Sequence, residues 1–214
     1  GHTLHGHVAD GYWEDVGTLE AYSRAHADVL DGRVKVEIDG FQLGDRRWIG
    51  NDVEISPEAR IDDPVVIGDS CRIEPGAHLR PYTVLGTDVI VKADAFLERA
   101  VLHDHVYVGQ SANLRGCVIG RNTDLRSHVR VEEGTVVGDE CFVGQDAVIN
   151  PNVKVYPFKT VEAGAVVNSS IIWESKGARS LFGRHGVNGL ANVDVTPELA
   201  TRVAMAFGTT LRKG

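Results

Sequence analysis

Aliphatic residues recur every six positions through the middle of the chain. Steps of six, with two steps of five, connect 21 positions that are all Ile, Leu or Val: Ile49, Ile55, Ile61, Ile67, Ile73, Leu79, Leu85, Val91, Leu97, Leu102, Val108, Leu114, Ile119, Leu125, Val131, Val137, Val143, Ile149, Val155, Val161 and Val167. An α-helix cannot use this period, because six residues at about 100° each bring the side chain to a different face. The rhythm therefore predicts short strands joined by regular bends.

A second set of residues lies four positions after each member of the first. These residues are small or β-branched throughout, with Lys159 as the exception. Separations of four and six are both even, so both sets point to the same side of an extended chain. At the two shortened repeats this rule predicts Val101 and Val118 as inward residues. Lys159 marks the point where we expect the core to end.

A modulation over three repeats predicts the cross-section of the domain. Glycine follows five of the seven residues Ile49, Ile67, Leu85, Leu102, Ile119, Val137 and Val155. Each of the two five-residue steps ends the third side of a turn, and the two turns are consecutive. The shortened corners should therefore lie above one another. We predict a triangular prism of about seven coils over residues 48–173, about 30 Å long at an inter-strand spacing of about 4.8 Å. Ile67, Leu85, Ile119 and Val137 should stack in its interior.

The flanks of the repeat predict two short helices. Residues 18–32 form one, with Thr18 as N-cap and Gly32 as terminator. A second begins at Thr196-Pro197-Glu198, where proline takes the first helical position. The connector 33–47 has some strand character at Val34, Val36 and Ile38. Trp48 and Trp173 bracket the prism and are interpreted as end-capping aromatics.

Composition excludes several classes of partner. The 214 residues carry 22 basic and 30 acidic side chains, and the formal net charge of -8 would repel nucleic acid and anionic lipid. No apolar run approaches the roughly 20 residues that span a bilayer, and no signal-peptide pattern opens the chain. We expect a cytoplasmic protein without membrane or nucleic-acid partners. Cys71, Cys117 and Cys141 share no C-x-x-C spacing and are expected to be free, buried thiols.

The hexapeptide pattern resembles the left-handed parallel β-helix family, and the handedness is taken from this resemblance. The segment Gly-Tyr-Trp-Glu-Asp-Val-Gly-Thr at 11–18, followed by Leu-Glu-Ala-Tyr, resembles the closing motif of sugar-1-phosphate nucleotidyltransferases. The resemblance implies that Asp15 helps to hold a catalytic Mg²⁺. A hard carboxylate oxygen beside bound phosphates suits this ion. From spacing alone, Asp15 could equally be a turn residue before the helix.

The C-terminal segment Ser-Leu-Phe-Gly-Arg-His-Gly-Val-Asn-Gly at 180–189, with Thr-Pro-Glu at 196–198, is similar to the opening of phosphohexomutases. Val187-Asn188 replaces the Ile-Arg pair of that family, so its phosphate-contacting arginine is missing. The whole chain resembles the middle of a fusion between a mannose-1-phosphate guanylyltransferase and a phosphomannomutase. The expected domains are the end of a nucleotidyltransferase domain with a connector at 1–47, the β-helix at 48–173, and a linker with the start of a mutase-like domain at 174–214.

The resemblance implies that the parent enzyme joins a sugar 1-phosphate to a nucleoside triphosphate, releasing pyrophosphate, in nucleotide-sugar biosynthesis. The glycine-rich nucleotide loop of such enzymes is not found in these residues, so no catalytic set is complete here. We expect this chain to be inactive alone, with a structural role and self-association into a homo-oligomer through the β-helix.

Three other functions are weighed against this one. A hexapeptide acyltransferase needs a histidine base on a projecting loop, but the repeats contain two deletions and no insertion. A hydro-lyase zinc site needs three histidines about 17 to 18 residues apart, a spacing that His78, His103, His105 and His128 miss. A non-catalytic regulatory or scaffolding module remains open. The arginines at 115, 121, 126 and 130 suggest either a solvated face or a basic strip for an anionic effector.

Overall fold

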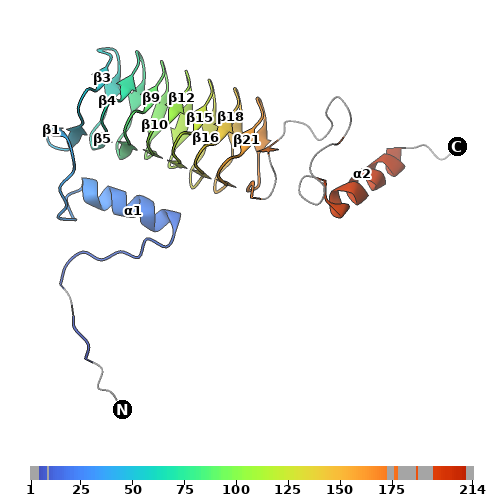
Figure 1. The fold of residues 1–214 in the computed structure, drawn as a ribbon, viewed down its shortest axis with the longest axis horizontal. Helices are drawn as coiled ribbons and strands as arrows, with labels where there is room; N and C mark the ends of the chain where they lie inside the picture. Colours follow the sequence, from blue (N-terminus) through green and yellow to red (C-terminus); the bar gives the residue numbers. More distant parts are fainter. Residues whose placement is uncertain (1–4, 9, 173–175, 178–186, 188–194, 211–214) are drawn as a thin grey trace.

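The structure is a computed structural model that describes residues 5–8, 10–172, 176–177, 187 and 195–210. Its centre is the predicted three-sided parallel β-helix, whose coils stack along one axis (Figure 1). Each coil contributes one strand to each of three sheets, and neighbouring coils pair in parallel. The fold class predicted from the six-residue period is therefore confirmed.

Strands three apart in the chain are neighbours in each sheet, apart from the two terminal strands β1 and β23. Sheet A contains β1 (Phe41–Leu43), β2 (Arg47–Ile49), β5 (Val65–Ile67), β8 (Thr83–Leu85), β11 (Val101–Leu102), β14 (Val118–Ile119), β17 (Val136–Val137) and β20 (Lys154–Val155). Sheet B contains β3 (Glu54–Ile55), β6 (Arg72–Ile73), β9 (Ile90–Val91), β12 (Tyr107–Val108), β15 (Asp124–Leu125), β18 (Phe142–Val143), β21 (Thr160–Val161) and β23 (Lys176–Gly177). Sheet C contains β4 (Arg60–Ile61), β7 (His78–Leu79), β10 (Phe96–Glu98), β13 (Asn113–Arg115), β16 (Arg130–Val131), β19 (Val148–Ile149) and β22 (Val166–Val167).

The register places the predicted aliphatic residues directly above one another. Ile67 pairs with Leu85, and the same column continues through Leu102, Ile119 and Val137. All the predicted aliphatic positions are buried except Ile49, Ile55 and Ile61, which are half-buried. These three belong to the first coil, which has a neighbouring coil on one side only. The core is therefore a continuous column that is weakest at its first turn.

The two shortened corners differ from the prediction. Ala100 and Cys117 belong to the buried core, whereas Val101 and Val118 align with Val84 on the outer surface of sheet A. Removing one residue from a corner moves the inward slot one position earlier, from four residues after the preceding aliphatic to three. The prediction of Val101 and Val118 as inward residues was therefore wrong.

Lys159 does not end the core. The residue is half-buried, and the buried column continues beyond it through Val161, Ala165, Val167 and Ile171. The three cysteines are free and buried, as expected. Loss of water around the Cys117 thiol raises its pKa to about 12, so this group stays protonated and behaves as a small apolar residue.

Glycine and aspartate act together at the corner that follows sheet A. The Asp139 carboxylate reaches back one coil and accepts the backbone N–H of Arg121 at 2.7 Å, and Asp69 and Asp104 bind the preceding coil in the same way. A Cβ atom added to Gly120 would lie 2.5 Å from both the backbone nitrogen and Oδ1 of Asp139. The glycine is needed because the next coil approaches its backbone so closely.

Both predicted helices are present. The first is α1 (Leu19–Leu30), whose N-cap Thr18 accepts a hydrogen bond from the Ala21 N–H at 3.1 Å. The second is α2 (Pro197–Thr210), which Thr196 caps through the Leu199 N–H. Gly32 follows α1 with a φ of +73°, as expected for a helix terminator.

The strands predicted in the connector at Val34, Val36 and Ile38 are not formed. The Val36 N–H bonds to the Val34 carbonyl, a tight turn that is incompatible with a ladder. Instead β1 pairs antiparallel with β2 and covers the edge of sheet A. Trp173 lies outside the described residues.

We expect truncation in the middle of the prism to be more costly than at its end. Ile119→Ala should lower the free energy of unfolding by about 2 to 5 kcal/mol, because the fully buried side chain leaves a cavity. Ile55→Ala, at the half-buried first coil, should lower it by clearly less. Urea unfolding of both variants measures the difference, and equal losses would contradict the stacked-column description.

We expect Gly120→Ala to lower the unfolding free energy by about 1 to 3 kcal/mol, because the added methyl overlaps the backbone of the next coil. Gly6→Ala is the matched control, since an added Cβ there meets nothing within 4 Å. Thermal unfolding of both variants tests this close approach. A wild-type transition for Gly120→Ala would show that the coils can separate without loss.

Candidate functional site

Helix α1 lies along the outer surface of sheet A, beside the prism in Figure 1. The outward side chains of this sheet form a column that is apolar except at its last member: Trp48, Val66, Val84, Val101, Val118, Val136 and Lys154. Tyr22 and Val29 of α1 face this column. Val101 and Val118 are only 5% and 7% exposed, although they point away from the core. The helix and the prism therefore form one packed unit.

Hydrogen bonds fix both halves of α1 to the prism. The Tyr22 hydroxyl lies 3.3 Å from His103 Nε2. Near the end of the helix, the Tyr82 hydroxyl donates to Asp31 at 3.2 Å, and Arg46 donates to the same carboxylate at 2.9 Å. His103 occupies a corner position where neighbouring coils have glycine, and its side chain is the one that reaches the helix.

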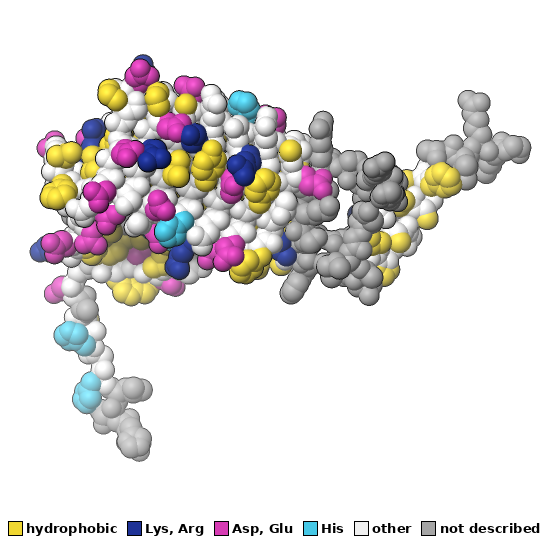
Figure 2. All heavy atoms as spheres, turned by 45° about the horizontal axis from the view of Figure 1, so that its top comes forward, with side chains coloured by type: hydrophobic (Ala, Val, Ile, Leu, Met, Phe, Trp, Pro, Cys, Tyr) yellow, Lys and Arg dark blue, Asp and Glu magenta, His cyan; other side chains and the backbone are white. Residues whose placement is uncertain are grey.

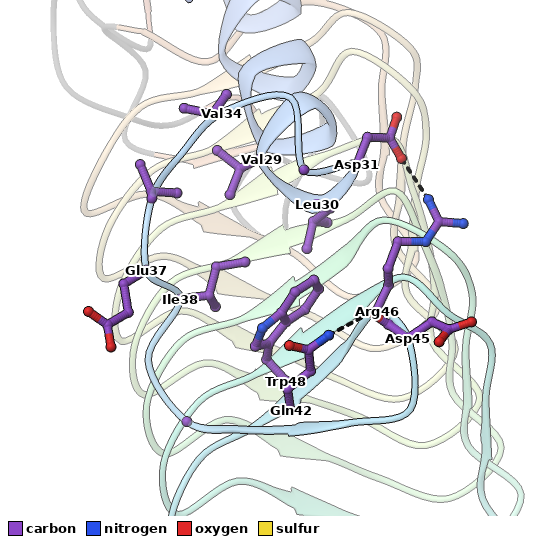
Figure 3. Close-up of a pocket in the computed structure, with 13 residues that line it drawn as sticks. Val29, Leu30, Asp31, Val34, Glu37, Ile38, Gln42, Asp45, Arg46 and Trp48 are labelled. Atoms are coloured by element: carbon purple, nitrogen blue, oxygen red, sulfur yellow. Dashed lines mark hydrogen bonds and ion pairs between the residues drawn. The ribbon is translucent and has the colours of Figure 1, made fainter.

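A cavity of about 460 Å³ lies between the end of α1, the connector and the β1–β2 hairpin (Figure 3). Trp48 points into it beneath Leu30, with Ile38 beside it. Its polar groups are largely paired with one another: Arg46 with Asp31, and the Gln42 amide with the Asp45 carbonyl at 2.6 Å. Because these groups are already paired, we interpret the cavity as a junction between α1 and the first coil. Trp48 thus serves this junction rather than capping the end of the prism.

Asp15 lies on the exposed segment that leads into α1, three residues before the N-cap Thr18. Its neighbours tie this segment to the helix: Glu14 pairs with Arg24 at 2.5 Å, and the Tyr12 hydroxyl donates to Asp28 at 2.9 Å. The Asp15 carboxylate itself stays accessible. The segment is therefore anchored to α1 by residues before Asp15 and continues into the helix through Thr18 after it.

Within the described residues, no group of three or more His, Cys, Asp or Glu side chains could hold a metal ion. Asp15 can supply one oxygen ligand. Mg²⁺ commonly takes one or two protein carboxylates and completes its shell with water and substrate phosphates. The donor available here fits a shared magnesium site but does not build one alone.

The four histidines of the prism are not brought together. His78 lies 2.8 Å from Asp62, His105 lies 3.0 Å from Asp88, and His128 lies 3.1 Å from Asp146. With His103 bound to Tyr22, each histidine has a different partner in another coil or helix. His78, His105 and His128 each join neighbouring coils, and His103 joins the prism to α1.

The four arginines also lie apart. Arg115 stacks on Phe96 of sheet C, 5.3 Å from the ring centre. Arg130 pairs with Glu132 on the same sheet. Arg121 lies at the corner between sheets A and B, and Arg126 follows β15 of sheet B. The basic strip considered from the sequence is not formed, because these residues are distributed around the prism.

Sheet B carries a cluster that the sequence reasoning missed. Asp124 lies between Tyr107 and Phe142 on neighbouring strands. Arg126 pairs with Asp124 Oδ2 at 3.0 Å, and its guanidinium stacks 5.8 Å from the Tyr107 ring centre and 5.3 Å from that of Phe142. The signal was present in the spacing, because the three outward residues recur at intervals of 17 and 18.

The Asp124 carboxyl is unusual for an outer face. Its Oδ1 atom is buried and makes no hydrogen bond with any described residue. Burial raises the pKa of this carboxyl, partly opposed by the charge of Arg126. Such an unpartnered oxygen is energetically unfavourable in the isolated chain.

The fold and the docked α1 define a hexapeptide-repeat β-helix domain with one helix packed on sheet A. The sequence model for the family described as the GMPPB C-terminal domain matches residues 61–172, just over half of the chain. The chain belongs to this family. No helix among the described residues is long and apolar enough to cross a bilayer.

Curated relatives extend the match beyond the family model. A glucose-1-phosphate adenylyltransferase of Bradyrhizobium diazoefficiens is 34% identical over 164 residues, which covers 72% of this chain and 34% of the relative. The same enzyme of Desulfitobacterium hafniense is 27% identical over 170 residues, covering 72% of this chain and 41% of the relative. The chain thus spans less than half the length of these relatives.

Solved structures show only a distant likeness. The Arabidopsis UDP-N-acetylglucosamine acyltransferase is 15% identical with a TM-score of 0.48, covering 58% of each chain. The enzyme of the same name from Campylobacter jejuni gives 19% and 0.41, covering 78% of this chain and 74% of that one. These values are too low to support a functional assignment.

We expect Tyr22→Phe to loosen α1, because it removes the hydrogen bond to His103 while keeping the ring in place. The loss should be about 0.5 to 1.5 kcal/mol, seen as faster amide hydrogen exchange in residues 19–30. Tyr107→Phe on sheet B, remote from α1, serves as the control. Unchanged exchange in α1 would show that apolar packing alone holds the helix.

Proposed function

We propose that this chain is the C-terminal β-helix region of a mannose-1-phosphate guanylyltransferase, together with the last helix of its catalytic domain. The parent reaction would join a sugar 1-phosphate to a nucleoside triphosphate and release pyrophosphate, in nucleotide-sugar biosynthesis in the cytoplasm. The observation that carries the proposal is the docking of α1 and its preceding motif on the family's β-helix. Mannose and guanine are the specific choices that the resemblance to a fusion with a phosphomannomutase suggests.

The residues of this chain would hold a metal-binding segment in place rather than form a complete active site. Asp15 would supply one carboxylate ligand to Mg²⁺, which neutralises charge on the phosphates when bound. Thr18 caps α1 after Asp15, and the contacts of Glu14 and Tyr12 hold the segment that precedes Asp15. The prism fixes α1 in turn. Precise placement matters because this chemistry depends on positioning and charge cancellation.

The prism would also associate with further copies of the chain, giving a homo-oligomer. Its flat outer faces and the half-buried first coil support this role. Residues 174–214 would form a linker and the start of a phosphomannomutase-like domain; β23 in this range still pairs in sheet B, and α2 with its Thr196 cap lies nearer the C-terminus.

A regulatory scaffold is the second candidate. It is favoured by the single isolated metal donor, because nothing else among the described residues is specific to catalysis. The two functions differ in the nucleotide-binding loop of the catalytic domain, which would lie upstream of Asp15. An intact nucleotide-binding loop there would indicate an enzyme, and a degenerate loop would indicate a scaffold.

We expect the 214-residue chain alone to release no pyrophosphate from GTP, Mg²⁺ and mannose 1-phosphate. Joined to its natural upstream domain, the same chain should be active, and Asp15→Asn should lower kcat on the order of 100-fold or more, because a metal ligand is lost. Asp10→Asn, on the same exposed segment, is the control. Pyrophosphate release by the isolated chain, or full activity of Asp15→Asn, would contradict the proposal.

A further inference from the structure

The outer face of sheet B has the composition of an interaction surface. Its outward side chains form one column along the prism: Glu54, Arg72, Ile90, Tyr107, Asp124, Phe142 and Thr160. Helix α1 covers sheet A and leaves this column free. Figure 2 shows how closely hydrophobic, basic and acidic side chains are interspersed on the prism surface. Phe142 is 38% exposed.

The centre of this column contains the residue types that dominate protein interfaces. Tyrosine, phenylalanine and arginine side chains meet at Tyr107, Phe142 and Arg126. Arg126 satisfies one oxygen of Asp124 and leaves Oδ1 without a donor.

The order of charges along the column makes the face complementary to itself in one orientation. A two-fold axis between β9 and β12 sets Arg72 of one copy against Asp124 of the other, and Ile90 against Tyr107. Two copies with parallel axes would instead set Arg72 against Arg72 and Asp124 against Asp124. Antiparallel pairing therefore joins Arg72 to Asp124 and Ile90 to Tyr107 and sets Glu54 against Phe142, whereas parallel pairing joins like charges.

The neighbouring face lacks this property. The outward column of sheet C contains Arg60, His78 and Arg130 and no acidic residue: Arg60, His78, Phe96, Asn113, Arg130, Val148 and Val166. Two copies of this column would meet with basic and uncharged side chains, and the acidic residues next to it, Glu98 and Glu132, lie outside the column. Sheet B is thus the uncovered face whose own outward column carries both signs of charge.

We propose that two copies of this chain pair through sheet B, with antiparallel prism axes and a two-fold axis between β9 and β12. This rests on the self-association proposed above and names the face that carries it. In each of two symmetry-related contacts, the Arg72 guanidinium of one copy, which also pairs with Glu54 of its own copy, meets the exposed part of the Asp124 carboxylate of the other. Arg126 keeps its hold on Oδ2 and on the two rings.

Charge reversal tests this pairing. Arg72→Glu places a carboxylate opposite Asp124, and Asp124→Lys places an ammonium opposite Arg72. Sedimentation equilibrium of the 214-residue chain should show a wild-type dimer, at least a tenfold weaker dimer for each single variant, and recovery in the double variant. Arg130→Glu is the matched control, because its side chain is 60% exposed on sheet C against 55% for Arg72 on sheet B. Circular dichroism confirms that each variant is folded.

Cross-linking gives a second measurement that does not depend on the charged variants. Ile90→Cys with Tyr107→Cys should give a reducible dimer under mild oxidation, since the two positions face each other across the axis and the native cysteines are buried. If both charge-reversal variants form the wild-type oligomer and the cysteine variant does not cross-link, sheet B is not the contact face, although the chain still self-associates. A wild-type monomer would overturn self-association as well, without bearing on the nucleotidyltransferase assignment.

Discussion

Stacking of each coil on the next is the constraint on which the whole structure depends. Strands of two or three residues are too short to be stable alone, and they persist because each inward side chain contacts its equivalents above and below. Leu85 and Ile119 keep the same inward position although the coils between them are one residue shorter. The same constraint requires glycine where Asp139 approaches Gly120, and it leaves the first coil less buried than the rest.

Sequence reasoning succeeded where this constraint is repeated and failed where it is not. An aliphatic residue occupies the interior column at Ile67 and Leu85 in every coil, so a period of six was enough to locate it. Val101 was misplaced because a shortened corner changes which residue turns inward. The cluster around Asp124 and the docking of α1 depend on outward residues, which coil stacking does not restrict. Their positions become meaningful only once the three-sided register is known.

The functional assignment follows the same division. The family match covers the repeated part of the chain, where the pattern is strongest. In the proposed function, that part is linked to catalysis by helix α1, which is held by Tyr22 bonded to His103, 81 residues away, and by Asp31 bonded to Tyr82, 51 residues away. The prism thereby determines where α1 lies, and α1 determines where the segment carrying Asp15 leaves the domain. A rigid support can in this way influence chemistry that it does not perform.

The coil length of 17 or 18 residues has a consequence for how such a domain can change in size. Loss or gain of one whole coil would preserve every vertical contact and would alter the axial length by about 4.8 Å. Loss of a single residue is tolerated at a corner, provided that a small side chain such as Ala100 takes the inward slot. The length of the domain can therefore change in steps of one coil while the packing of its interior stays the same.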